Sequence, residues 1–367
     1  MNPSVLFSPI NLGPIKLKNR FVRSATHDFM AEEDGTISPR QLELYRNLAR
    51  GDIGLIITGH AYVLPSGKAS PRQIAIYADR FIPGLRQLTS IVHETESKIF
   101  LQLSHAGRQT KEYICGCQPL APSAVYEPVY KVMPREMTQA EIEEVIQAFI
   151  AAAKRAQEAG FDGVQLHCAH GYLLSSFLSP YTNRREDPWG GSLENRARII
   201  LEILRGIKKE AGQDFPVIAK LNSSDYLPGG FEVAEAAEVA RMLEAEGLDA
   251  IEVSGGSAES GRGSMWSGVR PEEEEGYFVP AASLIKRNVR IPIIGLGGLR
   301  TLRVMEKFVA SGQVDLVAMS RPFIREPDLI QRFERGEVSG ASCISCNKCF
   351  NPRGIACAEL KKQEIKG

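Results

Sequence analysis

The sequence predicts an α/β protein built as a single (β/α)8 TIM barrel, and two observations support this fold class. Eight short apolar segments recur along the 367 residues, and segments of helical length separate most of them. Most of the eight are continuously apolar, which is typical of parallel strands buried on both faces. The expected strands span residues 20–26, 53–63, 98–107, 163–171, 215–224, 248–257, 291–299 and 314–323.

The segments between these strands are expected to form helices over residues 40–50, 80–96, 138–159, 193–211, 232–246, 276–288 and 301–311. Strands and helices that alternate in this way favour a closed barrel. The alternative, a doubly wound sheet, is disfavoured because eight strands are expected and no G-x-G-x-x-G sequence follows the first. We also expect an N-terminal β-hairpin that caps the barrel.

Two loops and the C-terminal tail are longer than ordinary connections. Residues 108–137 follow the third expected strand and residues 254–275 follow the sixth. Long loops after barrel strands lie on the catalytic face and often form lids. The chain is therefore expected to comprise a barrel over residues 1–335 and a cysteine-rich tail over residues 336–367.

The composition limits the partners and the compartment. The 44 basic and 44 acidic side chains balance, and no basic run is interleaved with aromatic residues, so nucleic-acid binding is not expected. The N-terminus lacks the apolar core of a signal peptide, and no run approaches about 18 apolar residues. We therefore expect a cytoplasmic protein without a membrane partner. The chain has seven cysteines, and four of them lie within residues 343–357. In the cytoplasm such cysteines favour metal binding or thiol chemistry over disulfides.

Polar residues gather at the carboxyl ends of the expected strands. Those ends meet at one mouth of a barrel, so side chains far apart in sequence should converge there. Any one of them alone could be a capping or loop residue, but nine together are harder to explain in that way. They are His27, His60, Gln102, His105, His167, His170, Lys220, Ser254 and Arg321.

The stretch VQLHCAHGYLLSSFLSP (164–180) places two histidines and a tyrosine at the end of one strand. His167 and His170 could bind zinc, but a catalytic zinc needs a third protein ligand, which another histidine at the mouth would have to supply. Two satisfied structural histidines are another alternative. The favoured interpretation is a pair of N–H donors aimed at a substrate oxygen, with Tyr172 as a proton donor beside them.

The motifs GLGG (295–298) and MSR (319–321) end the seventh and eighth expected strands. In barrels of this class, those two loops commonly bind phosphate through backbone N–H groups. Glycines let the backbone approach the anion, and Arg321 would add charge-assisted hydrogen bonds. Together the two motifs predict a phosphate site.

Three motifs, in this order and spacing, resemble the Old Yellow Enzyme family of FMN-dependent ene-reductases. They are QLSHAGR (102–108), FDGVQLHCAHGYLLSSFLSPYTNRREDPWGGSLENRAR (161–198) and SRPFI (320–324). The resemblance covers about residues 4–330 and implies a TIM barrel with FMN across its mouth. It also implies that NADH or NADPH reduces the activated C=C bond of a small-molecule enone or enoyl substrate.

The resemblance assigns roles residue by residue. It implies FMN contacts from Ser24, Ala25, Thr26, His27, Gly59, His60, Gln102, Lys220, Gly297, Gly298, Ser320 and Arg321. Lys220 stands where most members carry an arginine, so the positive charge near flavin N1 is kept while the guanidinium fork is lost. His167 and His170 would hydrogen-bond the substrate carbonyl oxygen, and Tyr172 would protonate the α-carbon after hydride reaches the β-carbon.

The tail sequence CISCNKCFNPRGIAC has the pattern C-x2-C-x2-C-x7-C and contains Cys343, Cys346, Cys349 and Cys357. It resembles the [4Fe–4S] segment of the dienoyl-CoA reductase and trimethylamine dehydrogenase branch of the family, although its spacing is tighter. An iron–sulfur cluster, structural zinc and unligated thiols all stay open. Members of that branch continue into two further nucleotide-binding domains, whereas this sequence ends ten residues after Cys357. Because those domains would otherwise deliver electrons, an external electron-donor protein is expected here.

Three other functions stay open. A flavin-dependent dehydrogenase or demethylase, fed or drained through an iron–sulfur cluster, is disfavoured because an amine offers no carbonyl for two histidines to clamp. A phosphosugar lyase or isomerase would be colourless, whereas a flavoprotein is yellow. A non-catalytic electron-transfer subunit would dock a reductase through the tail. The loop 254–275, with Met265 and Trp266, is expected to shape the pocket, and a homo-oligomer is also compatible with the sequence.

Overall fold

Eight parallel strands close into a barrel in the computed structural model, which describes residues 4–261, 263–269 and 272–361. The strands are β3 (Phe21–Arg23), β4 (Leu55–Ile57), β6 (Lys98–Ser104), β9 (Gly163–Cys168), β10 (Val217–Asn222), β11 (Ala250–Ser254), β12 (Ile293–Gly295) and β13 (Leu316–Met319). Each pairs with the next, and β13 pairs with β3 to close the ring. A short extra strand, β5 (Ala61–Tyr62), pairs with the end of β6. The predicted barrel is confirmed, because each of the eight barrel strands falls within an expected segment.

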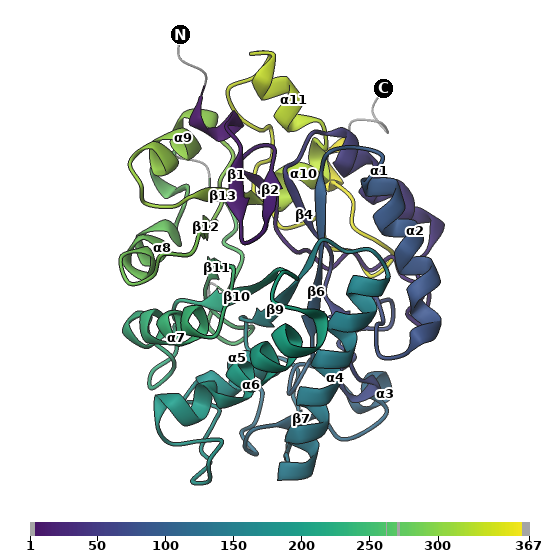
Figure 1. Ribbon diagram of the computed structural model, residues 1–367, viewed down its shortest axis with the longest axis vertical. Coiled ribbons are helices and arrows are strands. Elements are labelled where there is room, and N and C mark those ends of the chain that lie inside the picture. Colours follow the sequence, from purple (N-terminus) through teal and green to yellow (C-terminus); the bar gives the residue numbers. More distant parts are fainter. Residues whose placement is uncertain (1–3, 262, 270–271, 362–367) are drawn as a thin grey trace.

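The seven expected helices are also present, and Figure 1 shows them around the outside of the strands. They are α1 (Pro39–Arg50), α2 (Ile82–Val92), α4 (Gln139–Glu158), α6 (Leu193–Ala211), α7 (Val233–Ala245), α8 (Val279–Lys286) and α9 (Leu302–Ala310). Capping boxes start α1, at Ser38 with Gln41, and α4, at Thr138 with Glu141. Two short helices after β13 complete the ring, α10 (Arg321–Arg325) and α11 (Leu329–Glu334).

An N-terminal hairpin closes one end of the barrel, as expected. Its strands β1 (Ile10–Leu12) and β2 (Ile15–Leu17) pair antiparallel. Leu12 and Leu17 are fully buried against apolar residues inside the barrel, among them Phe100, Ile218 and Ile294. This end is therefore filled by apolar side chains, and the opposite end, where the strands finish, is left for polar ones.

Alternation along the strands separates two environments. On β10, Val217, Ala219 and Leu221 pack into the core between strands and helices, whereas Ile218 packs inside the barrel. Lys220 continues the inward-facing set two residues after Ile218. The interior thus changes from apolar near the hairpin to polar near the mouth.

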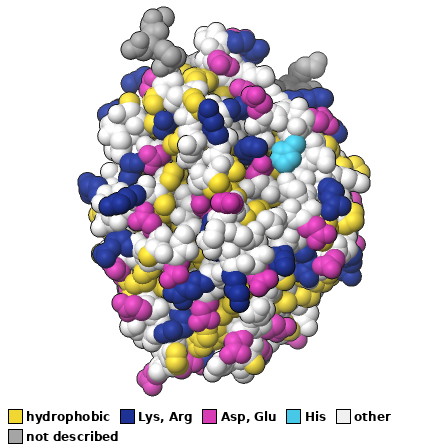
Figure 2. Space-filling view, in the orientation of Figure 1, with side chains coloured by type: hydrophobic (Ala, Val, Ile, Leu, Met, Phe, Trp, Pro, Cys, Tyr) yellow, Lys and Arg dark blue, Asp and Glu magenta, His cyan; other side chains and the backbone are white. Residues whose placement is uncertain are grey.

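Figure 2 shows basic and acidic side chains interspersed over the face that it draws. Among the helices of the described chain, none combines the length and the apolar character needed to cross a membrane.

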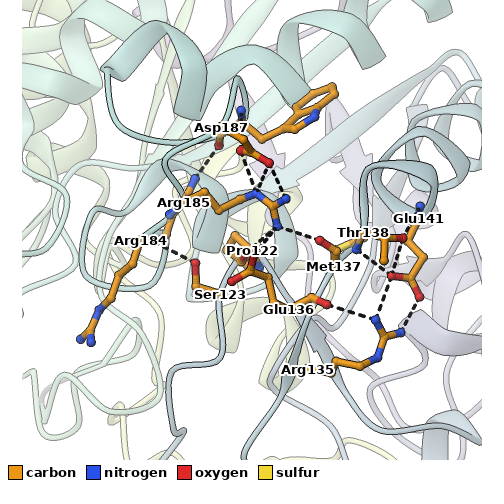
Figure 3. Close-up of polar contacts among 12 residues, drawn as sticks. Pro122, Ser123, Arg135, Glu136, Met137, Thr138, Glu141, Arg184, Arg185 and Asp187 are labelled. Atoms are coloured by element: carbon orange, nitrogen blue, oxygen red, sulfur yellow. Dashed lines mark hydrogen bonds and ion pairs between the residues drawn. The ribbon is translucent and has the colours of Figure 1, made fainter.

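The loop 108–137 has structure of its own, which the sequence did not predict. It contains α3 (Glu112–Cys115) and a small parallel pair, β7 (Leu120–Ala121) with β8 (Arg135–Glu136). Figure 3 shows how Arg185, which follows α5 (Leu173–Leu178), holds this loop. Its guanidinium donates to the carbonyl oxygens of Pro122 (3.0 Å) and Met137 (2.7 Å), one beside each strand of the pair. Asp187 accepts from Nε of the same guanidinium at 2.9 Å.

Replacing Arg185 by methionine should destabilise the protein. Two buried carbonyl oxygens would lose a charged donor, and such hydrogen bonds contribute roughly 1.5–3 kcal/mol each. We expect the free energy of unfolding to fall by about 2–4 kcal/mol in urea titrations followed by circular dichroism. Arg184→Met is the matched control, because the neighbouring Arg184 is exposed, and it should change the value by less than about 0.5 kcal/mol. Equal effects of the two substitutions would contradict the anchoring role.

Candidate active site

A cavity of about 230 Å³ opens at the carboxyl ends of the strands, and all eight strands or the residues that follow them contribute to its wall. Most of the predicted site residues line it. They are Ser24, Ala25, Thr26, His27, His60, Gln102, His167, His170, Tyr172, Lys220, Ser254, Gly297, Gly298, Ser320 and Arg321. The convergence predicted from strand ends is therefore present, while the role of each residue stays a proposal.

Two predicted residues lie behind the wall instead. The Gly59 N–H donates to the hydroxyl of Tyr45 (2.9 Å), and a side chain at position 59 would bring its Cβ within 2.9 Å of the Thr26 carbonyl oxygen. His105 is buried, with Nε2 3.3 Å from the Ser66 hydroxyl. Neither is among the residues that line the cavity. Both residues therefore contribute to the packing behind the cavity wall and not to its surface.

Four imidazoles and one phenol form a cluster in the cavity. The rings of His167 and His170 are perpendicular, with centroids 5.2 Å apart. Tyr172 lies 4.6 Å from His167 and 5.1 Å from His60, measured between ring centroids. His27 completes the cluster 4.8 Å from His60. The tyrosine is thus placed beside both His167 and His60, which follows the end of β4.

The cluster is uncharged at neutral pH. Burial lowers the pKa of His167 and of His170 well below the ordinary histidine value, and Lys220 lowers both further. Burial, with Lys220, likewise lowers the pKa of His60 to about 4. Burial raises the pKa of Tyr172 above its ordinary value, so the phenol keeps its proton. Neutral imidazoles each carry one N–H, and the site can therefore donate hydrogen bonds without charge.

His170 has a left-handed backbone, with φ at 65°, which is uncommon for any residue other than glycine. Its N–H donates to the side-chain oxygen of Asn222 (3.0 Å), and its carbonyl oxygen accepts from Gln109 (2.5 Å). Its Nε2 lies 2.7 Å from the hydroxyl of Ser254. Gly171, the next residue, is also left-handed, with φ at 81°, which favours glycine at that position. Asn222 and Gln109 were missed from the sequence, because nothing in it marks a histidine as left-handed.

Lys220 is the buried cation of the site. It reaches across the barrel from β10 to the hydroxyl of Ser24 (2.9 Å), which follows β3 on the opposite side. Burial lowers the pKa of Lys220, and the carboxylate of Glu252, 3.5 Å from Nζ, acts against that effect. Glu252, Arg23 and Gln165 lie inside this part of the barrel but were not predicted, although each is a polar residue within an apolar strand.

The other end of the cavity is formed by the last two strand ends. Gly297 has φ at 122°, and a Cβ there would come within 2.9 Å of the backbone nitrogens of Tyr277 and Phe278. The Arg321 guanidinium donates to the carbonyl oxygen of Trp266 (2.8 Å) and to the side chain of Asn347 (2.6 Å). A cation and close backbone approach thus lie together, which is the arrangement that a phosphate group requires.

The loop 254–275 contributes to the cavity, apart from residues 262, 270 and 271, which lie outside the described chain. Met265 lines the cavity as expected. Trp266 instead stacks on Tyr277, with ring centroids 4.2 Å apart and planes 6° from parallel. Tyr277 and the tail residue Phe350 also line the cavity, and neither was predicted.

These residues fit FMN. His167 has a buried Nδ1 with no hydrogen-bond partner among the described residues, so the wall presents an unused polar atom. Cations stand at the centre of the mouth, from Lys220, and at its glycine-rich end, from Arg321.

The four tail cysteines line a second, much smaller cavity, and Arg321 borders both cavities. Across residues 4–261, 263–269 and 272–361, no three Cys, His, Asp or Glu side chains already lie close enough to ligate one metal ion. Ser345 and Asn347 have left-handed backbones, so the chain turns sharply between the first three cysteines. Burial raises the pKa of the Cys349 thiol to about 11, and such a thiol loses its proton readily only beside a cation.

Comparison with known proteins gives consistent matches. A model of the NADH:flavin oxidoreductase / NADH oxidase family matches residues 5–339. NADH oxidase of Thermoanaerobacter brockii is 41% identical over 93% of this chain and 52% of that protein. An NADPH dehydrogenase of Geobacillus sp. strain WCH70 is 37% identical over 88% of this chain and 92% of that protein.

Among solved structures, 2-naphthoyl-CoA reductase in complex with 2-naphthoyl-CoA is similar, with a TM-score of 0.89 and 33% identity. The match covers 94% of this chain and 54% of that chain. The chain therefore spans about half the length of this reductase and of the Thermoanaerobacter brockii protein, and nearly the whole length of the Geobacillus protein.

The buried histidines should make stability depend on pH. Burial lowers the pKa of His105 to about 4. The unfolded chain takes up this proton near pH 6.5 and the folded protein does not, so stability is fully present above pH 6.5 and is lost as pH falls towards 4. His105→Gln should flatten the decline in unfolding free energy by roughly 1 kcal/mol per pH unit, measured by urea titrations between pH 7 and 4.5. Ser66→Ala, which keeps the imidazole, should retain the wild-type slope, and an unaltered slope in His105→Gln would refute the assignment.

Proposed function

The chain belongs to the NADH:flavin oxidoreductase / NADH oxidase family, and we propose that it uses NADH or NADPH to reduce the activated C=C bond of an α,β-unsaturated carbonyl compound. The observation that carries this proposal is the histidine–tyrosine cluster. Two neutral imidazoles stand perpendicular beside an un-ionised phenol, in a cavity that also contains Lys220. This arrangement offers two N–H donors and one acid, as carbonyl-activated reduction requires.

FMN would lie across the mouth of the barrel. Gln102 and Lys220 would contact its ring system, and Gly297, Gly298, Ser320 and Arg321 would hold its phosphate. Strand-end residues Ser24, Ala25, Thr26, His27 and His60 would complete the wall around it. When bound, FMN supplies hydride transfer between the nicotinamide and the substrate.

The chain's own residues would activate the substrate. His167 and His170 would each donate an N–H to the carbonyl oxygen. These hydrogen bonds would draw electron density from the double bond and make the β-carbon electrophilic, so that it can accept hydride. The Tyr172 hydroxyl would then give its proton to the α-carbon and recover one from solvent. The balance is one hydride from NAD(P)H and one proton for each C=C bond reduced.

A second candidate function uses the tail. An iron–sulfur cluster held by Cys343, Cys346, Cys349 and Cys357 would pass single electrons between the flavin and an external donor or acceptor protein. One observation favours it: Arg321 borders both cavities, and Phe350, next to Cys349, lines the flavin cavity. The chain would then act as a flavin-dependent dehydrogenase or as a reductase fed by protein. Structural zinc at the same cysteines is the alternative that metal analysis distinguishes.

Replacing Tyr172 by phenylalanine tests the proposed reaction. The substitution keeps the ring contacts and removes only the hydroxyl, so FMN content and flavin reduction by NAD(P)H should be unchanged. Flavin reoxidation by a simple cyclic enone should slow by roughly 10²–10⁴, which is the usual contribution of a general acid. Stopped-flow absorbance of each half-reaction measures this. Equal slowing of both halves would show a structural role, and purified wild-type protein that neither contains nor rebinds FMN would refute the proposed function.

Replacing Cys346 by serine tests the tail. Loss of one of four ligands usually leaves a metal site labile, so the variant should lose iron and sulfide, or zinc, while it keeps FMN. Metal analysis of protein purified without oxygen measures both. Cys117→Ser, which alters a cysteine of the loop 108–137, should keep the metal. Wild-type protein with substoichiometric metal and four freely alkylatable tail thiols would exclude a metal centre.

A further inference from the structure

Five polar side chains lie inside the barrel at the level of the cavity. Each comes from a different strand, and none is more than 3% exposed. They are Arg23 of β3, Gln102 of β6, Gln165 of β9, Lys220 of β10 and Glu252 of β11. The proposed function uses Gln102 and Lys220 and leaves the carboxylate without a role.

Glu252 is fully buried and is only partly compensated. Its Oε2 accepts a hydrogen bond from the Gln165 amide (2.8 Å) and lies 3.5 Å from Lys220 Nζ. Its Oε1 has no hydrogen-bond partner in the part of the chain that the structure describes. Because a buried carboxylate is costly unless it is paired, Lys220 is its essential counterion.

Arg23, the second buried cation, is influenced mainly by groups other than Glu252. Burial lowers the pKa of Arg23 to about 10, with Tyr45 and Asp28 the strongest of the groups that oppose this change. Arg23 donates to the carbonyl oxygen of Ser24 (2.5 Å). Glu252 is therefore paired chiefly with Lys220, its direct neighbour in the register of β10 and β11.

The Glu252 carboxylate also orients the side-chain amides of Gln165 and Gln102. Gln165 donates to Glu252, so its own oxygen is left to accept from the Gln102 amide nitrogen at 2.7 Å. This relay orients Gln102, which lines the cavity. Glu252 thus reaches the cavity by two routes, through the ammonium of Lys220 and through the amide of Gln102.

We propose that Glu252 is a positioning residue that lowers the reduction potential of the flavin bound in this cavity. The inference rests on the proposed FMN site. Reduction of a flavin bound in this cavity would add negative charge near Lys220, and the lysine favours that charge. The Glu252 carboxylate, 3.5 Å from the ammonium, repels that charge and offsets part of the lysine's field. In the protein interior such a charge acts strongly over a few ångströms.

The test is Glu252→Gln in the FMN-loaded protein. The amide removes the negative charge and keeps an oxygen for Gln165. The equilibrium constant for two-electron reduction should rise at least tenfold, a shift of about 30 mV to more positive potential. Spectroelectrochemical titration of the flavin absorbance at pH 7 measures it. Lys220→Met, which removes the favourable cation, should shift the potential in the opposite direction.

Asp249→Asn is the matched control. Asp249 immediately precedes β11 and pairs with Lys208 (2.7 Å) at the hairpin end of the barrel, so its loss should leave the potential unchanged. A Glu252→Gln protein with full FMN content and the wild-type potential would overturn the inference. If that variant does not fold or loses FMN, Glu252→Ser carries the same test. Wild-type protein without FMN would instead refute the proposed function, so the two failures are distinguishable.

Discussion

The site depends on one buried cation. Lys220 spans the barrel mouth from β10 to Ser24, and its charge is felt by the imidazoles around it. After burial itself, Lys220 contributes to lowering the pKa of His60, His167 and His170. Burial is the main cause of the neutral imidazoles, the cation adds to it, and the site can therefore offer N–H donors without charge. The same cation requires Glu252 behind it, which extends the polar network towards Gln165 and Gln102.

The fold accommodates this network by dividing the barrel interior. Near the hairpin, inward positions are apolar, as at Phe100 on β6 and Ile218 on β10. Two residues later on the same strands, the inward positions are Gln102 and Lys220. Alternate residues of a strand share a face, so a single strand can supply both apolar residues near the hairpin and polar residues that line the cavity. The stability of the barrel and the chemistry of its mouth therefore come from successive positions of the same elements.

This division of the barrel interior explains which strands and site residues could be predicted from the sequence. The apolar segments predicted all eight strands, because the residues that face the helices are apolar along the whole strand. Residues after the strand ends were found because all strands finish at one mouth, as with His170 and Arg321. Glu252 and Gln165 were missed although each interrupts an apolar strand, since they were read as parts of continuous runs. The left-handed backbone of His170 and the place of His105 behind the wall depend on contacts from distant segments.

Arg321 connects the barrel with the cysteine-rich tail, which were expected from the sequence to be separate parts of the chain. Its guanidinium donates to Trp266 in the loop 254–275 and to Asn347 between the second and third tail cysteines. The tail is therefore held to the barrel through the side chain that stands at the glycine-rich end of the cavity. The hydrogen bonds to Trp266 and Asn347 both come from Nη1 of the guanidinium. One cation therefore borders both the mouth of the barrel and the loop that carries the tail cysteines.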